Sequence, residues 1–183
     1  MTKQIDDLLI IDDKEYIICN RVNLYTPQDF GMKPVMHSTG LWRGFRAEYM
    51  LDGEQLKLKT IYIHIEDMYQ PINGQMPINR KDGLPMCYQN VNINANFDYL
   101  LIGHNMVDWN IWQLLNFSDV RGLHFHDGKL MKQVDYSQVV DRLRFTHWWR
   151  KYLPNLSVKE DYLWLSKHIP LKDYGFEWML ISL

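Results

Sequence analysis

The feature that constrains this fold most is a stretch in which apolar side chains recur at every second position on both sides of a tight turn. Residues 45–49 alternate apolar and charged side chains, and residues 56–59 alternate leucine and lysine. A period of two predicts two strands that each bury one face. Asp52-Gly53 predicts the turn between them, because glycine adopts positive φ at no steric cost. The apolar phase then shifts at residues 61–65, which predicts either a β-bulge or a change of strand near Thr60.

Two other parts of the chain repeat this strand, turn and strand pattern. The segments, in chain order, are 8–11, 12–14 and 15–19, and then 120–126, 127–128 and 129–134. Asp12-Asp13 and Asp127-Gly128 are turn residues, since Asp and Gly tolerate the backbone of tight hairpins. Each part therefore predicts an antiparallel hairpin.

Between the second and third hairpins lies a segment rich in residues that break regular structure. Residues 70–89 contain three prolines and two glycine-ended turn pairs, which predicts a long loop. Asparagine then alternates with apolar residues over Asn90–Asn96, which predicts a half-buried strand with four amides on one face. This strand is either an exposed edge kept soluble by its amides or one wall of a polar groove.

Helical spacing of apolar residues is confined to the later part of the chain. It predicts a helix over residues 136–153, which Pro154 ends, and a short helix over residues 106–115. Ser157-Val158-Lys159-Glu160 fits a capping box, which predicts a further helix through residue 168.

These elements predict an α+β fold, an antiparallel β-sheet built from hairpins with two C-terminal helices packed on it. A chain of 183 residues fits a single domain. We expect residues 5–135 to be β-rich, residues 136–168 to be helical and residues 169–183 to form a tail.

Composition and charge narrow the classes of function. The apolar run at residues 8–11 is too short for a signal peptide or a membrane span, so we expect a cytoplasmic protein without a membrane partner. Cys19 and Cys87 form no disulfide or metal-binding pattern. The net charge of −2 combines an acidic middle, residues 61–120, with a basic end, residues 121–183. Aromatic residues reach 14%, including seven Trp, and large rings anchor cores and interfaces.

The acidic middle is the predicted partner-binding surface. Its carboxylates would speed encounter with a basic partner, and its Trp rings would supply affinity. The predicted residues are Glu66, Asp67, Asp82, Asp108, Trp109 and Trp112.

Arg43 suggests an alternative site. It shares the phase of the buried strand face, where a guanidinium needs partners for its donors. It is either a structural residue paired with an internal carboxylate or part of a ligand pocket with Asn92 and Asn94. The second interpretation would make the chain a small-ligand-binding or enzymatic domain.

Other chemistry has weaker support. The basic stretch 129–151, with Trp148 or Trp149 as a stacking platform, could bind nucleic acid, but its charge excess is small for that role. His124 and His126 would share one side of a strand and could ligate a metal with His64 or His104. We expect these histidines to be ordinary surface residues, and we expect no metal, no cofactor and no catalytic residue.

The segment Ser38–Tyr49, which contains Trp42-Arg43-Gly44-Phe45, is followed by Leu51-Asp52-Gly53 and Leu56-Lys57-Leu58. This arrangement, with Leu100–Gly103 and the 123–130 hairpin, resembles small bacterial proteins that carry a Trp-Arg-Gly-aromatic strand. Those proteins resemble immunity proteins of toxin systems. The resemblance implies a protein that binds and neutralises a partner toxin, and it carries no catalytic residue to this chain.

Overall fold

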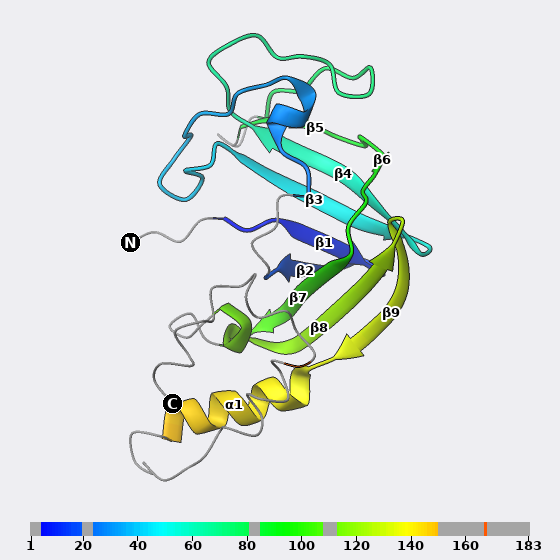
Figure 1. Ribbon diagram of the computed structural model, residues 1–183. Coiled ribbons are helices and arrows are strands. Elements are labelled where there is room, and N and C mark those ends of the chain that lie inside the picture. Colours follow the sequence, from blue (N-terminus) through cyan, green and yellow to red (C-terminus); the bar gives the residue numbers. More distant parts are fainter. Residues whose placement is uncertain (1–4, 20–23, 81–84, 108–112, 150–166, 168–183) are drawn as a thin grey trace. The chain divides into compact units, whose positions relative to one another are not determined.

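A computed structural model describes residues 5–19, 24–80, 85–107, 113–149 and 167 (Figure 1). The chain divides into two compact units. The first unit comprises residues 1–18, 22–98 and 125–131, and the second comprises residues 19–21, 99–124 and 132–183. That the whole chain forms one domain stays a prediction.

Two predicted hairpins are confirmed in the first unit. Strands β1 (Leu8–Ile11) and β2 (Lys14–Ile18) are antiparallel, and Asp12 and Asp13 between them both have positive φ. Strands β3 (Phe45–Asp52) and β4 (Gln55–Ile63) form the second hairpin (Figure 1). Its turn is Gly53-Glu54, one residue later than predicted, because Asp52 still pairs with Gln55.

The predicted bulge near Thr60 is also confirmed. Glu48 pairs with Thr60 but its neighbour Tyr49 pairs with Leu58, so Lys59 is the extra residue of β4. Because a bulge adds one residue to a strand, the apolar residues after it return to the buried face even though their alternation in the sequence has shifted by one position. The side chains that become fully buried on β3 and β4 are Ala47, Tyr49, Leu56, Leu58, Ile61 and Ile63.

Three short elements complete the first unit. The 3₁₀ helix η1 (Pro27–Phe30) precedes β3, and strands β5 (Met86–Tyr88) and β6 (Ile93–Asn94) both pair with β4. The prediction of loop structure throughout residues 70–89 is therefore wrong at β5.

The predicted strand Asn90–Asn96 is also wrong, since only β6 within it is a strand. Asn90 and Asn92 have φ of 54° and 52°, a left-handed backbone that asparagine tolerates. Val91 and Ala95 are buried while Asn90, Asn92, Asn94 and Asn96 are exposed. The alternation of apolar residues with asparagine therefore predicts burial correctly, although the backbone is not extended.

The second unit contains β7 (Tyr99–Met106), the 3₁₀ helix η2 (Gln113–Asn116), β8 (Phe117–His126), β9 (Lys129–Asp135) and α1 (Ser137–Trp149). β7 and β8 are antiparallel. β8 and β9 are neighbouring strands joined by Asp127-Gly128, both with positive φ, so the third predicted hairpin is confirmed. The tip of this hairpin, residues 125–131, belongs to the first unit, where Lys129 pairs with Gln55.

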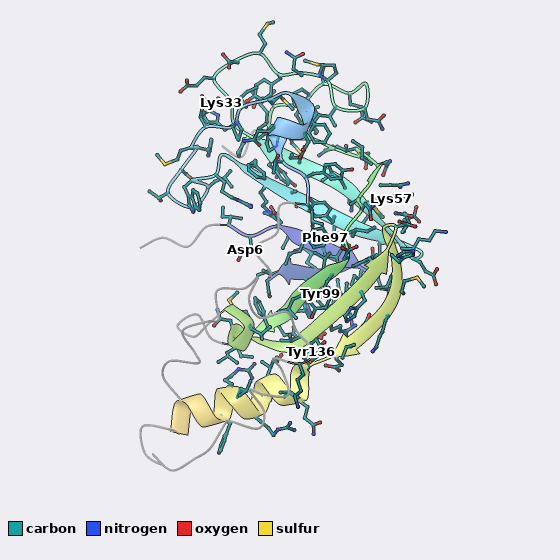
Figure 2. The ribbon with its side chains drawn as sticks, in the orientation of Figure 1. Asp6, Lys33, Lys57, Phe97, Tyr99 and Tyr136 are labelled. Atoms are coloured by element: carbon teal, nitrogen blue, oxygen red, sulfur yellow. The ribbon has the colours of Figure 1, made fainter. Side chains whose placement is uncertain are left out.

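In the core of the second unit, two tyrosine side chains fill the space beside Gly122 of β8, which has no side chain of its own. A Cβ at Gly122 would lie 2.6 Å from both Tyr136 Cε2 and Tyr99 Oη, two residues labelled in Figure 2. Burial raises the pKa of Tyr136, and its hydrogen bond with Tyr99 partly offsets that rise. Arg144 of α1 is buried, and its guanidinium donates to the carbonyls of Leu115 and Phe117. These bonds hold α1 against η2 and the start of β8.

The predicted fold class is wrong in two respects. β1 pairs in parallel with β3, so the sheet is mixed and not antiparallel. The described residues contain one α-helix of several turns, α1, and not the two C-terminal helices that were predicted to pack on the sheet. The helix expected over residues 157–168 lies outside the described residues apart from Lys167, and within residues 106–115 the described part is the end of β7 and the start of η2. None of the helices described here is long and apolar enough to cross a membrane.

Candidate functional site

Backbone hydrogen bonds bring three separate segments of the first unit together. Ile5 donates from its amide to the Gly40 carbonyl at 2.7 Å. Val35 donates to the His64 carbonyl at 2.9 Å, and His64 donates to the Gly44 carbonyl at 2.8 Å. The N-terminal segment, the loop before β3 and the segment after β4 are therefore linked through their backbones.

A tight turn sets the side-chain directions in the loop before β3. The Leu41 amide donates to the Ser38 carbonyl at 3.0 Å, and the Gly44 amide donates to the Leu41 carbonyl at 3.0 Å. Leu41 is buried, whereas its neighbour Trp42 is 59% exposed. Gly44 has φ of 76°, which lets the chain leave this turn and enter β3.

Large apolar side chains are exposed on all three segments. They are Ile5 at 40%, Met36 at 64%, Trp42 at 59% and Met68 at 80% exposure, and we call these four residues the Trp42 surface. Single exposed apolar residues are normal on proteins, whereas large contiguous apolar patches are typical of interaction sites. Thioether side chains adapt to irregular surfaces, and Trp is enriched among the residues that dominate binding energy.

Two of the predicted partner-binding residues border this surface. Glu66 and Asp67 are exposed on the segment that also carries Met68. The other four predicted residues, Asp82, Asp108, Trp109 and Trp112, lie outside the described residues. The structure therefore places an acidic pair beside exposed apolar side chains that sequence reasoning did not assign.

Arg43 forms an ion pair with the carboxylate of Asp7. Its Nη2 lies 2.9 Å from Asp7 Oδ1, which also accepts the Ala47 amide at 2.8 Å, and its guanidinium carbon lies 4.6 Å from the centre of the Phe45 ring. Burial raises the pKa of Asp7, and the contacts with Arg43 and the Ala47 amide offset part of that rise. This geometry gives Arg43 a structural role, which is to hold the segment before β1 against β3.

The other two residues of the predicted pocket are exposed. Asn92 has a left-handed backbone, and Asn94 belongs to β6. The Asn94 carbonyl accepts the Tyr25 hydroxyl at 2.9 Å, and the Tyr25 amide donates to the Tyr49 hydroxyl at 3.0 Å. Contacts with Tyr25 thus account for the position of this segment, and a ligand pocket there stays a prediction.

The candidate metal ligands do not form a cluster. His124 is half-buried against the Tyr99 ring, with ring centres 4.8 Å apart, whereas His126 is exposed and its Nε2 lies 3.6 Å from Asp127 Oδ2. Burial and the nearby charge of Lys132 lower the pKa of His124. Across the described parts of both units, no group of three His, Cys, Asp or Glu side chains could hold a metal ion.

Comparison of the chain with models of protein families, with curated proteins and with solved structures finds no match. The site must therefore be interpreted from its own geometry.

Sequence reasoning missed all four residues of the Trp42 surface, namely Ile5, Met36, Trp42 and Met68. The available signal was the phase of Trp42, which is opposite to that of Leu41 and Arg43 and so points away from the buried face. No periodic pattern surrounds Met36 or Met68, because both lie on irregular segments.

Proposed function

We propose that this chain is an immunity-type protein of the cytoplasm that binds and neutralises a partner protein through the Trp42 surface. The observation that carries the proposal is the exposure of Met36, Trp42 and Met68 on segments that are joined by backbone hydrogen bonds. When a partner removes an exposed apolar ring from water, the free energy of binding becomes more favourable.

The charge beside this surface indicates the kind of partner. Glu66 and Asp67 add two exposed carboxylates next to Met68. Carboxylates at the rim of an interface attract a basic surface and speed association, whereas buried rings slow dissociation. We therefore expect the partner to present a basic patch around an apolar cleft that admits an indole ring.

The experiment is capture of the partner from lysate of the native host, with the full chain as bait. Trp42→Ala should lose the partner that the unchanged chain retains. Met131→Ala is the matched control, because Met131 is 67% exposed in the first unit but lies on β9, outside the Trp42 surface. A partner that both variants retain equally would contradict the proposal.

A further inference from the structure

Two histidine rings from different segments of the first unit lie in contact. His37 is in the loop before β3, and His64 follows directly after β4. Their ring centres are 5.0 Å apart, and the ring planes are inclined at 77°. Two imidazoles that bind one tetrahedral metal ion have ring centres about 5 Å apart, because each metal–nitrogen bond is about 2.0–2.1 Å long. The spacing of these two residues, which we call the histidine pair, therefore suits two ligands of one ion.

Backbone hydrogen bonds hold both members of the histidine pair in place. The His37 amide donates to the Leu41 carbonyl at 3.3 Å. The His64 amide donates to the Gly44 carbonyl at 2.8 Å, and the His64 carbonyl accepts from the Val35 amide at 2.9 Å. A binding group that the fold already holds loses less conformational entropy on binding than a mobile one. The two rings are therefore preorganised, and no ion is needed to bring them together.

The ring nitrogens of the histidine pair are accessible to a ligand. Within the described residues, neither imidazole forms a hydrogen bond or an ion pair with another group. Both side chains are half-buried, but none of their nitrogens is among the buried polar atoms that lack a partner in this part of the chain. A nitrogen that has no protein partner and is not buried is in contact with water. A hydrated ion can therefore reach both rings.

The chemistry of the available ligands selects the kind of ion. Over the ranges that the structure describes, no group of three His, Cys, Asp or Glu side chains could hold a metal ion, so no thiolate or carboxylate joins the histidine pair as a third ligand. Imidazole nitrogen suits Zn²⁺, Cu²⁺ and Ni²⁺, whereas Mg²⁺ and Ca²⁺ prefer oxygen ligands. Two imidazoles thus favour the first three ions, among which Cu²⁺ forms the strongest complexes.

From the spacing of the two rings and the access to their nitrogens, we propose that His37 and His64 together bind one divalent transition-metal ion of the class Cu²⁺, Zn²⁺ and Ni²⁺. Water, or a donor group of another molecule, takes the remaining coordination positions. With two protein ligands the ion exchanges readily, so the chain purified without added metal is free of it and folds without it. The site does not depend on the proposed partner, and it includes neither His124 nor His126.

The experiment adds metal ions to the full chain and measures binding by calorimetry, with Zn²⁺, Cu²⁺ and Mg²⁺ in separate arms. Zn²⁺ and Cu²⁺ should bind, Cu²⁺ more tightly, and Mg²⁺ should not. Added Zn²⁺ should raise the melting temperature, because an ion that binds the folded state stabilises it. In NMR spectra of the unchanged chain, Zn²⁺ should shift the imidazole resonances of both His37 and His64, a readout that needs no substitution.

Variants assign the binding to the histidine pair. His37→Gln and His64→Gln should each raise the dissociation constant for Zn²⁺ at least about tenfold, because loss of a group that merely supports a ligand already weakens metal binding about 10–100-fold. His126→Gln is the matched control, because it removes an exposed imidazole of the first unit that lies outside the pair. Circular dichroism checks that each variant folds.

Three outcomes would overturn the proposal. The first is that neither Zn²⁺ nor Cu²⁺ binds the unchanged chain. The second is that His126→Gln weakens Zn²⁺ binding as much as His37→Gln and His64→Gln do, which would show binding to scattered surface imidazoles. The third is that Mg²⁺ binds as tightly as Zn²⁺, which would show a site made of oxygen ligands.

Discussion

Gly44 gives the sharpest test of the loop that presents Trp42. Its φ is 76°, and a Cβ added there would lie 2.1 Å from the carbonyl oxygen of Val35. Gly53 also has positive φ, 61°, but a Cβ there would meet no atom within 4 Å. Replacing each glycine by alanine therefore separates the cost of backbone conformation from the cost of a steric clash.

The magnitudes follow from these two terms. A left-handed backbone costs an alanine about 1–2 kcal/mol, so Gly53→Ala should lower the free energy of unfolding by about that amount. Gly44→Ala adds the clash with Val35. The Val35 backbone has little room to move, because its amide donates to the His64 carbonyl at 2.9 Å. Overpacking of this kind costs a further 1–3 kcal/mol or so, which gives a total of roughly 2–5 kcal/mol.

The assay is urea denaturation of the full chain and both variants, followed by circular dichroism. Gly44→Ala should be less stable than Gly53→Ala by at least about 1 kcal/mol. Equal losses in the two variants would refute the close approach of Gly44 to Val35, and with it the geometry of the loop that carries Trp42. Gly53→Val extends the series at the open site and should cost about 1–2 kcal/mol through backbone strain alone.

Three further outcomes are expected. Asp7→Ala should lower the free energy of unfolding by about 2–4 kcal/mol in denaturant melts, because it removes the carboxylate that pairs with the half-buried Arg43. A loss below about 0.5 kcal/mol is typical of a neutral surface change and would show that the pair does not hold β1 in place. The free energy of unfolding should fall on acidification from pH 7 toward pH 5, because the unfolded chain protonates His124 near its usual pKa of about 6.5 while the folded chain resists protonation. A His124→Gln variant should show a flatter dependence of stability on pH, and the same dependence in both proteins would argue against this cause. Dialysis against a chelator should leave the melting temperature unchanged, whereas a drop that zinc reverses would make His124 and His126 metal ligands.

Hairpins were the part of the fold that local sequence could predict. Their turns depend on residues adjacent in the chain, as at Asp12-Asp13 and Asp127-Gly128, and their strands on a period of two. The bulge near Thr60 was predictable for the same reason, because the shift in apolar phase is visible in a single segment.

Contacts between distant segments were not predictable. The parallel pairing of β1 with β3 joins residues about forty positions apart, such as Leu8 and Glu48, and no local signal distinguishes it from an antiparallel arrangement. β5 was hidden because its three residues follow a segment full of turn-forming residues. In Asn90–Asn96 the burial pattern mimics a strand, while positive φ at two asparagines breaks the extended backbone.

In the candidate site too, local sequence predicts some features, whereas contacts between distant segments determine the others. The phase of Arg43 indicated that its guanidinium needs an internal partner, but that the partner is Asp7, 36 residues earlier, depends on the tertiary fold. Glu66 and Asp67 could be selected by charge alone. The link between their segment and the loop that carries Met36 and Trp42 could not be predicted, because it depends on the hydrogen bonds between Val35, His64 and Gly44.

The most direct test of the central claim is a kinetic measurement with the purified partner once it is captured. Binding is followed by surface plasmon resonance for the unchanged chain, for Trp42→Ala and for the double variant Glu66→Lys, Asp67→Lys. Trp42→Ala should raise the dissociation rate at least about tenfold at unchanged melting temperature, and the double variant should slow association and weaken its dependence on salt. Unchanged dissociation in Trp42→Ala, together with unchanged association in the charge-reversed variant, would contradict binding through the Trp42 surface.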